Sequence, residues 1–254
     1  MTTTTRVPVR RSVDRPVVFA SLGAVTVIAW SVALQVAAAM RMPGGMTVTS
    51  PSVTLVMAMW VAMMVGMMVP SASPMVLAFA GWTRRDANEG GRVTRVAAFV
   101  CGYVLVWSFF SVFAATVQVV LDRVDVLSAM GVISRPVVGG SVLVAAGAFQ
   151  VSPWKGSCLA RCRSPIGFLV AEWRPGAGGA VLMGARHGLY CLGCCWMLMA
   201  VLFVVGTMHV VWMAILGGFV LAEKVAPRLW QVDRVGAILL VGWGTWALVT
   251  ELPW

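Results

Sequence analysis

The sequence predicts an all-α membrane protein, a polytopic bundle of about seven transmembrane helices. Hydrophobic residues make up 60% of the 254 residues and charged residues only 11%. The mean hydropathy is +0.90. A water-soluble globule of this length needs more polar surface than such a composition provides. In addition, several apolar stretches approach or exceed the roughly 20 residues that cross a bilayer as one helix.

Seven apolar segments are the expected spans. The first ends in small residues like a signal peptide, but its apolar stretch is longer than the usual core of such a peptide, so we expect a retained anchor. The second contains Pro70 and Pro74 and should break or kink there, and the sixth is short. The segments lie at about residues 17–39, 53–80, 96–120, 136–152, 180–206, 208–222 and 235–250.

The chain is expected to form one transmembrane domain. No long Pro, Ser or Gly tract marks a linker, and no internal repeat is evident. Residues 17–254 would make up this domain, after an N-terminal tail at residues 1–16. Between the fourth and fifth segments, residues 153–178 would form an excursion that contains two cysteines.

Positive charge is distributed unevenly among the expected loops. Of the 19 lysines and arginines, sixteen fall in the tail and in alternate loops, and three in the remaining loops. The positive-inside rule then places the N-terminus, the tail and the excursion in the cytoplasm and the C-terminus outside, in the cell inner (plasma) membrane. These loops also explain the net charge of +10. We therefore expect a lipid bilayer and no nucleic acid as a partner.

The fifth segment concentrates soft metal ligands in the run HGLYCLGCCWMLM. At 100° per residue, His187, Cys191, Cys194 and Cys195 fall on one stripe of a helix, toward its cytoplasmic end. Such a stripe faces one neighbour and can present several ligands to it.

Three further features are interpreted from their positions. Cys158 and Cys162, four residues apart in the excursion, would share a face if that segment is helical. Cys101, alone near the start of the third segment, is expected to pack in the core. Glu223 and Lys224 end the sixth segment and look like a snorkelling pair at the cytoplasmic interface.

The second segment is rich in methionine. Between Met57 and Met75 it holds seven of the 17 methionines, in two adjacent stripes with a spacing of four residues. Because this helix runs inward, its cytoplasmic half should reach the depth of the thiols. Thiolate, thioether and imidazole select Cu(I) or Zn, and thioether favours copper. The expected metal ligands are Cys191, Cys194, Cys195, His187, Cys158, Cys162, Met64, Met67 and Met68.

Two other interpretations stay open. Cys191 and Cys194 could cycle between dithiol and disulfide in a membrane thiol oxidoreductase, with Cys158 and Cys162 relaying electrons. Buried Cys and Met also serve as packing residues, so the chain could be a non-catalytic membrane subunit. Hydrolase, kinase and ion-pump chemistry lack their motifs, and the paired Cys-x-x-Cys of a structural zinc site is missing.

The combined motifs resemble a known family. The runs MMVGMMVPSASPMVL, VSPWKGSCLARCRSPIGFL and HGLYCLGCCWMLM, with the later EK, are similar to a bacterial family described as predicted metal-binding integral membrane proteins. The similarity covers about residues 53–226. It implies a metal site at the Met, Cys and His positions named above, and it does not identify the metal.

Together, motifs and resemblance predict a membrane protein that binds a soft transition metal. Cu(I) is the first candidate and zinc the second. The expected role is metal trafficking or delivery to a metal-accepting or metal-donating protein partner, rather than turnover of an organic substrate.

Overall fold

The computed structural model describes residues 14–40, 52–83, 89–128, 131–207, 209–226 and 230–250. Most of the expected N-terminal tail, residues 1–13, lies outside these ranges. Within them the chain is helical, with one isolated β-bridge between Leu127 and Ile133 and no strand. The helices are α1 (Asp14–Met40), α2 (Val53–Trp82), α3 (Glu89–Arg123), α4 (Pro136–Gln150), α5 (Pro153–Cys162), α6 (Pro165–Glu172), α7 (Gly176–Ala200), α8 (Leu202–Val205), α9 (Val210–Val225) and α10 (Val232–Thr250).

The all-α bundle expected from the sequence is confirmed. Five stretches are long and apolar enough to cross a membrane: α1, α2, α3, α7 with α8, and α10. Helices α4 and α5 meet at 62° and together make a sixth, bent candidate. All seven apolar segments contain a helix. However, α9 has 16 residues and is about 24 Å long, which is less than the roughly 30 Å of a hydrocarbon core.

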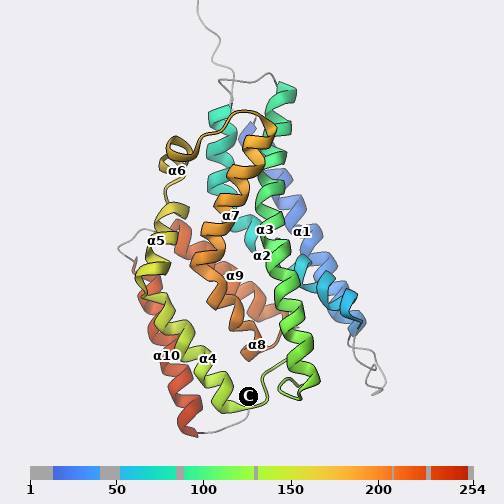
Figure 1. Cartoon of the computed structure of the whole chain (residues 1–254), viewed down its shortest axis with the longest axis vertical. Coiled ribbons are helices and arrows are strands. Elements are labelled where there is room, and N and C mark those ends of the chain that lie inside the picture. Colours follow the sequence, from blue (N-terminus) through green and yellow to red (C-terminus); the bar gives the residue numbers. More distant parts are fainter. Residues whose placement is uncertain are drawn as a thin grey trace, which may run out of the picture.

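Helices α2, α3 and α7 form the centre of the bundle, with α1 on one side and the pair of α4 and α10 on the other (Figure 1). Helices α3 and α7 pack along each other, and α2 packs against α3. Helix α1 lies along α2, while α4 and α10 pair beside the lower half of α7. Helix α5 packs on α7, and α9 packs on α2. Apolar side chains cover much of the outside, including Phe109 and Val249, which are 75% and 83% exposed. This surface is compatible with a membrane protein.

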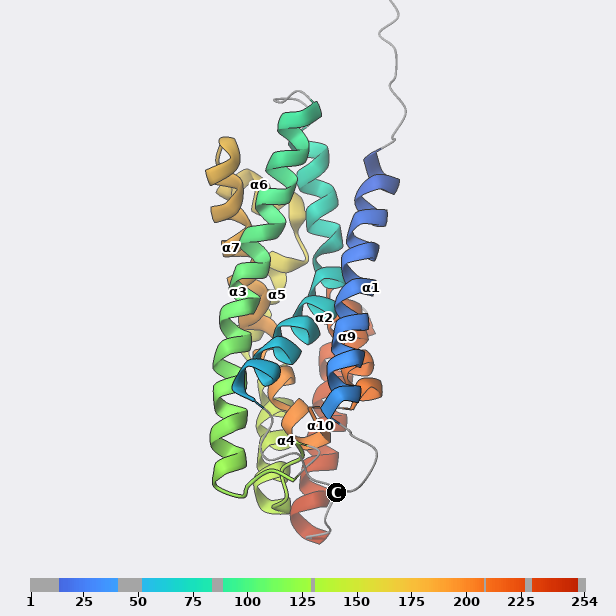
Figure 2. The same cartoon turned by 90° about the vertical axis from the view of Figure 1, so that its right-hand side faces the viewer.

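Helix α2 continues through both prolines but changes direction (Figure 2). A proline cannot donate to the carbonyl four residues earlier, so Pro70 and Pro74 free the carbonyls of Gly66 and Pro70. Trp30 Nε1 of α1 donates to Gly66 O at 3.2 Å, and Ser73 Oγ donates to Pro70 O at 2.7 Å. Both freed carbonyls are therefore satisfied within the protein, as an apolar environment requires.

Glycines let α3 and α7 approach closely. A Cβ added at Gly102 would collide with the backbone of Val181, and one added at Gly184 would collide with the backbone of Phe99. Small residues at such contacts are typical of membrane helix pairs. Glycines also let α4 and α10 approach closely. A Cβ added at Gly140 would lie 2.9 Å from the Gly244 carbonyl oxygen, and one added at Gly244 would lie 2.8 Å from the Gly140 carbonyl oxygen.

Gly184→Ala should therefore destabilise the protein, because its methyl group must push two helix backbones apart, at a cost of about 1–3 kcal/mol. Gly178→Ala is the matched control on the same helix, since no described residue lies within 4 Å of its added Cβ. Thermal unfolding in detergent should show a lower midpoint for Gly184→Ala only. Equal midpoints for the two variants would contradict the close approach of α3 and α7.

Candidate metal centre

Helix α7 places its soft ligands on one buried stripe, as the sequence predicts. His187 is 2% exposed, Cys191 and Cys195 are 0% exposed, and Cys194 is 1% exposed. The helix is uninterrupted from Gly176 to Ala200. The stripe therefore points into the bundle and not toward the lipid-facing exterior.

The Cys191 thiol is the point where four helices meet. Lys224 Nζ of α9 lies 2.9 Å from Cys191 Sγ, and the Tyr103 hydroxyl of α3 lies 3.1 Å from it. Lys224 Nζ also donates to Ser71 Oγ of α2 at 2.7 Å. The Tyr103 hydroxyl donates to the Met68 carbonyl of α2 at 2.9 Å. One sulfur is thus surrounded by a cation, a phenol and the bend of α2.

Four further thiols belong to α7 or α5: Cys194 and Cys195 lie within one helical turn of Cys191, and Cys158 and Cys162 lie on α5. Cys194 Sγ and Cys195 Sγ donate to the Cys191 carbonyl at 3.0 and 2.9 Å. Cys162 is a neighbour of the Cys194 thiol, as are Cys191 and Cys195. Cys194 therefore joins the thiols of α7 to the thiol at the end of α5.

Helix α5 presents both of its cysteines to α7, as their spacing predicts. Ser152 caps the helix by accepting from Lys155 N, and Pro153 occupies the first turn, where proline costs no hydrogen bond. Cys162 is buried, whereas Cys158 is half-buried and sits against Gly193, where an added Cβ would be 2.9 Å from its sulfur. All six cysteines are free thiols. The thiols therefore extend from a partly open position to the buried centre.

His187 sits among aromatic rings one turn before Cys191. Its ring centroid is 5.6 Å from that of Phe168, 5.7 Å from Tyr103 and 6.1 Å from Phe99. Its Nδ1 is buried and has no hydrogen-bond partner among the described residues. A buried unpaired nitrogen is unfavourable and calls for an explanation. A soft metal ion is one ligand that this nitrogen fits.

The methionines of α2 are buried in the same core as the thiols. Met64, Met67 and Met68 are each at most 3% exposed. The Tyr103 hydroxyl contacts both the Met68 carbonyl and Cys191 Sγ. Met68 therefore lies level with the thiols along the bundle. Met67 packs its Cβ and Cγ against Gly217 of α9. Packing is thus established for Met67, and coordination by these thioethers stays a prediction.

The prediction that Glu223 and Lys224 snorkel to the interface at the end of α9 is wrong. Glu223 and Lys224 are 1% and 8% exposed. The Glu223 side chain contacts α4 and α5, and the Lys224 side chain contacts α2 and α7. Lys155 Nζ of α5 contacts both carboxylate oxygens of Glu223, at 2.6 and 2.8 Å. Gln150 of α4 donates to the same carboxylate at 3.0 Å and also accepts from Lys155.

Several residues of this network were missed because their partners are distant in sequence. Tyr103 and Ser71 carry no motif, and only the three-dimensional contact with Cys191 and Lys224 reveals them. For Glu223 and Lys224 a signal existed: charged residues that end an apolar helix often mark functional sites in membrane proteins.

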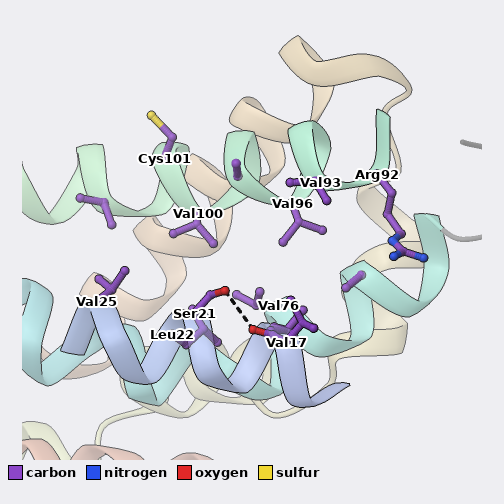
Figure 3. Close-up of a pocket in the computed structure, with 14 residues that line it drawn as sticks. Val17, Ser21, Leu22, Val25, Val76, Arg92, Val93, Val96, Val100 and Cys101 are labelled. Atoms are coloured by element: carbon purple, nitrogen blue, oxygen red, sulfur yellow. Dashed lines mark hydrogen bonds between the residues drawn. The ribbon is translucent and has the colours of Figure 1, made fainter. Parts of the chain in front are cut away.

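Cys101 is exposed and not in the core as expected. It borders an apolar pocket of about 490 Å³ between α1, α2 and α3, with Arg92 at the other end (Figure 3). Its sulfur points away from α1. The thiols of α5 and α7 do not line this pocket, so it is separate from the candidate centre.

In the described part of the chain, no group of three or more His, Cys, Asp or Glu side chains is arranged to hold a metal ion. Structural zinc requires four ligands in a tetrahedron. Cu(I) is bound by soft thiolates and can be held by two of them. Soft sulfur donors of the kind that line this centre select Cu(I) or zinc.

A comparison with protein families agrees with this chemistry. The family model described as "PpoB2: Copper chaperone" matches residues 57–247. The match includes α3 to α9 and nearly all of α2. It connects the chain with copper and agrees with the metal-related family expected from the motifs, without singling out residues. No curated protein and no solved structure matches the chain.

Proposed function

Because the chain belongs to the PpoB2 copper chaperone family, we propose that it carries Cu(I) as cargo and passes it to a metal-handling partner protein. The observation that carries this proposal is the buried thiol centre of α7, where Cys191 Sγ is held by Lys224 and Tyr103. Two further thiols lie within one turn of it. Thiolates in an apolar, enclosed site bind Cu(I) in preference to harder ions.

Cys191 and Cys195 would hold the resting ion. They are one helical turn apart, both fully buried, and Cys195 Sγ already points back to the Cys191 carbonyl at 2.9 Å. His187, one turn earlier on the same stripe, offers the unpaired Nδ1 as a third donor. Binding two thiolates releases two thiol protons and transfers no electrons.

Cys158, Cys162 and Cys194 would form the route by which the ion enters and leaves. Cys158 is the half-buried end of this series, and Cys194 has both Cys162 and Cys191 as neighbours. Each step exchanges one thiolate ligand for the next. Passage between adjacent thiols keeps the ion coordinated by sulfur throughout.

The proposed setting is the inner (plasma) membrane. The five candidate spans support a membrane setting. The charge distribution supports the N-terminus in the cytoplasm and the C-terminus outside. In one transmembrane domain from residue 17 onward, α5 and α6 would belong to a cytoplasmic excursion. The thiols would then meet a reducing environment that keeps them free to bind Cu(I).

The thiol oxidoreductase interpretation receives no support from the family match. Simple packing of the thiols remains the outcome that the first experiment must exclude. If the cysteines only fill space, serine substitutions will leave the copper content of the purified protein unchanged.

Cys191→Ser and Cys195→Ser should each abolish copper retention, because serine keeps the size of the side chain but replaces a soft donor with a hard one. His187→Ala should have an intermediate effect. Cys194→Ser should retain most copper but slow its transfer to a chelator. Copper per protein, measured on the reduced, purified protein, checks this order.

Cys101→Ser is the matched control, since this exposed thiol lies outside the centre. Equal loss in Cys191→Ser and Cys194→Ser, with none in Cys195→Ser, would contradict the proposed pair. Full copper content in all of these variants would mean that the thiols only pack.

The double variant Met67→Leu with Met68→Leu tests the thioethers. Leucine and methionine have similar volumes, so the fold should tolerate the change at a cost below about 1.5 kcal/mol. If a thioether completes the site, Cu(I) affinity should fall while the unfolding temperature stays close to that of the parent. Unchanged affinity would assign both methionines to packing.

Labelling with a membrane-impermeant thiol reagent tests the orientation. In intact cells Cys158 should stay unlabelled and become labelled after permeabilisation. A cysteine introduced at Ser134, in the exposed turn before α4, should be labelled from outside. Peptide masses identify the labelled positions, and labelling of Cys158 from outside would reverse the proposed orientation.

A further inference from the structure

Charges in the buried network do not balance. Lys155 and Glu223 form an ion pair whose side chains are both 1% exposed. Lys224, beside Glu223 in sequence, turns to the other side and donates to Ser71 Oγ and Cys191 Sγ. In the described part of the chain, the Lys224 ammonium has no carboxylate partner. One buried positive charge is therefore left facing the thiols.

An isolated buried ammonium group is costly unless an anion balances it. The serine hydroxyl is neutral, so the thiol centre is where the balancing charge belongs. A Cu(I) ion held by two thiolates forms a complex with a net charge of −1. Together with the Lys224 ammonium the site is then neutral.

A divalent ion gives a different result. Zn(II) with two thiolates is neutral, so the Lys224 charge stays unbalanced and does not stabilise the zinc complex. A third thiolate would restore neutrality for zinc, so the discrimination applies to a site that holds its ion with two thiolates. The position of Lys224 thus distinguishes metals by charge, in addition to the selection by soft sulfur ligands.

We propose that Lys224 is a specificity-determining residue of the thiol centre, whose ammonium balances a monovalent ion held by two thiolates and so favours Cu(I) over Zn(II). This inference rests on the proposed function. It adds to that function a reason why the family carries copper in particular. Tyr103, the other group at hydrogen-bond distance from Cys191 Sγ, is uncharged and therefore gives no such discrimination.

The test uses the full chain in detergent under anaerobic, reducing conditions. Affinities for Cu(I), Ag(I) and Zn(II) are measured by competition with chelators of known strength. Lys224→Gln should weaken Cu(I) and Ag(I) binding by roughly a hundredfold, as expected when one member of a buried charge pair is removed. Zn(II) binding should stay within a few-fold. Lys224→Arg should keep the preference for monovalent ions.

Tyr103→Phe is the matched control, because it removes a hydrogen bond to the same sulfur without changing the charge. It should affect the three metals to a similar extent. If Lys224→Gln weakens all three metals equally, or leaves the ratio of Cu(I) to Zn(II) affinity unchanged, the inference is wrong.

Ser71→Asp decides the question if Lys224→Gln does not fold. The new carboxylate lies beside Lys224 Nζ, neutralises its charge and keeps the lysine in place. Cu(I) and Ag(I) affinity should again fall, and unchanged affinity would overturn the role of the charge. Failure of the parent chain to bind Cu(I) at all would instead contradict the proposed function itself.

Discussion

The buried charges at the end of α9 determine how the rest of the bundle is arranged around the thiols. Glu223 and Lys224 cannot reach water, so each must find partners inside the protein. Glu223 pairs with Lys155 of α5 and accepts a hydrogen bond from Gln150 of α4. Lys224 donates hydrogen bonds to Ser71 of α2 and Cys191 of α7. Two adjacent residues thereby fix four other helices and hold α5 on α7.

The close contact of α3 and α7 completes the centre. Glycines at their interface bring the two backbones together, and this places Tyr103 on Cys191 and the rings of Phe99 and Tyr103 on His187. The site is consequently enclosed, apolar and lined with sulfur, and it carries one unbalanced positive charge. These properties suit a small, soft, monovalent cargo ion better than a hard or strongly charged one.

The sequence predicted the features that depend on local periodicity. The apolar segments, the stripe from His187 to Cys195 and the shared face of Cys158 and Cys162 all follow from the spacing of residues along a helix. Contacts between distant residues could not be predicted in this way. Ser71, Tyr103 and Lys155 have no local signature. Burial of Glu223 depends on its contacts with α4 and α5, and burial of Lys224 on its contacts with α2 and α7. The length of α9 could not be predicted either, because apolar composition alone does not fix where a helix ends.

X-ray absorption at the copper edge tests the central claim most directly. The full-length protein, purified under reducing conditions and loaded with Cu(I), should show a monovalent copper spectrum with a first shell dominated by two sulfur atoms. Loss of that sulfur shell in Cys191→Ser would place the ion at the α7 centre. A first shell of oxygen or nitrogen atoms alone, or an unchanged sulfur shell in Cys191→Ser, would contradict the account.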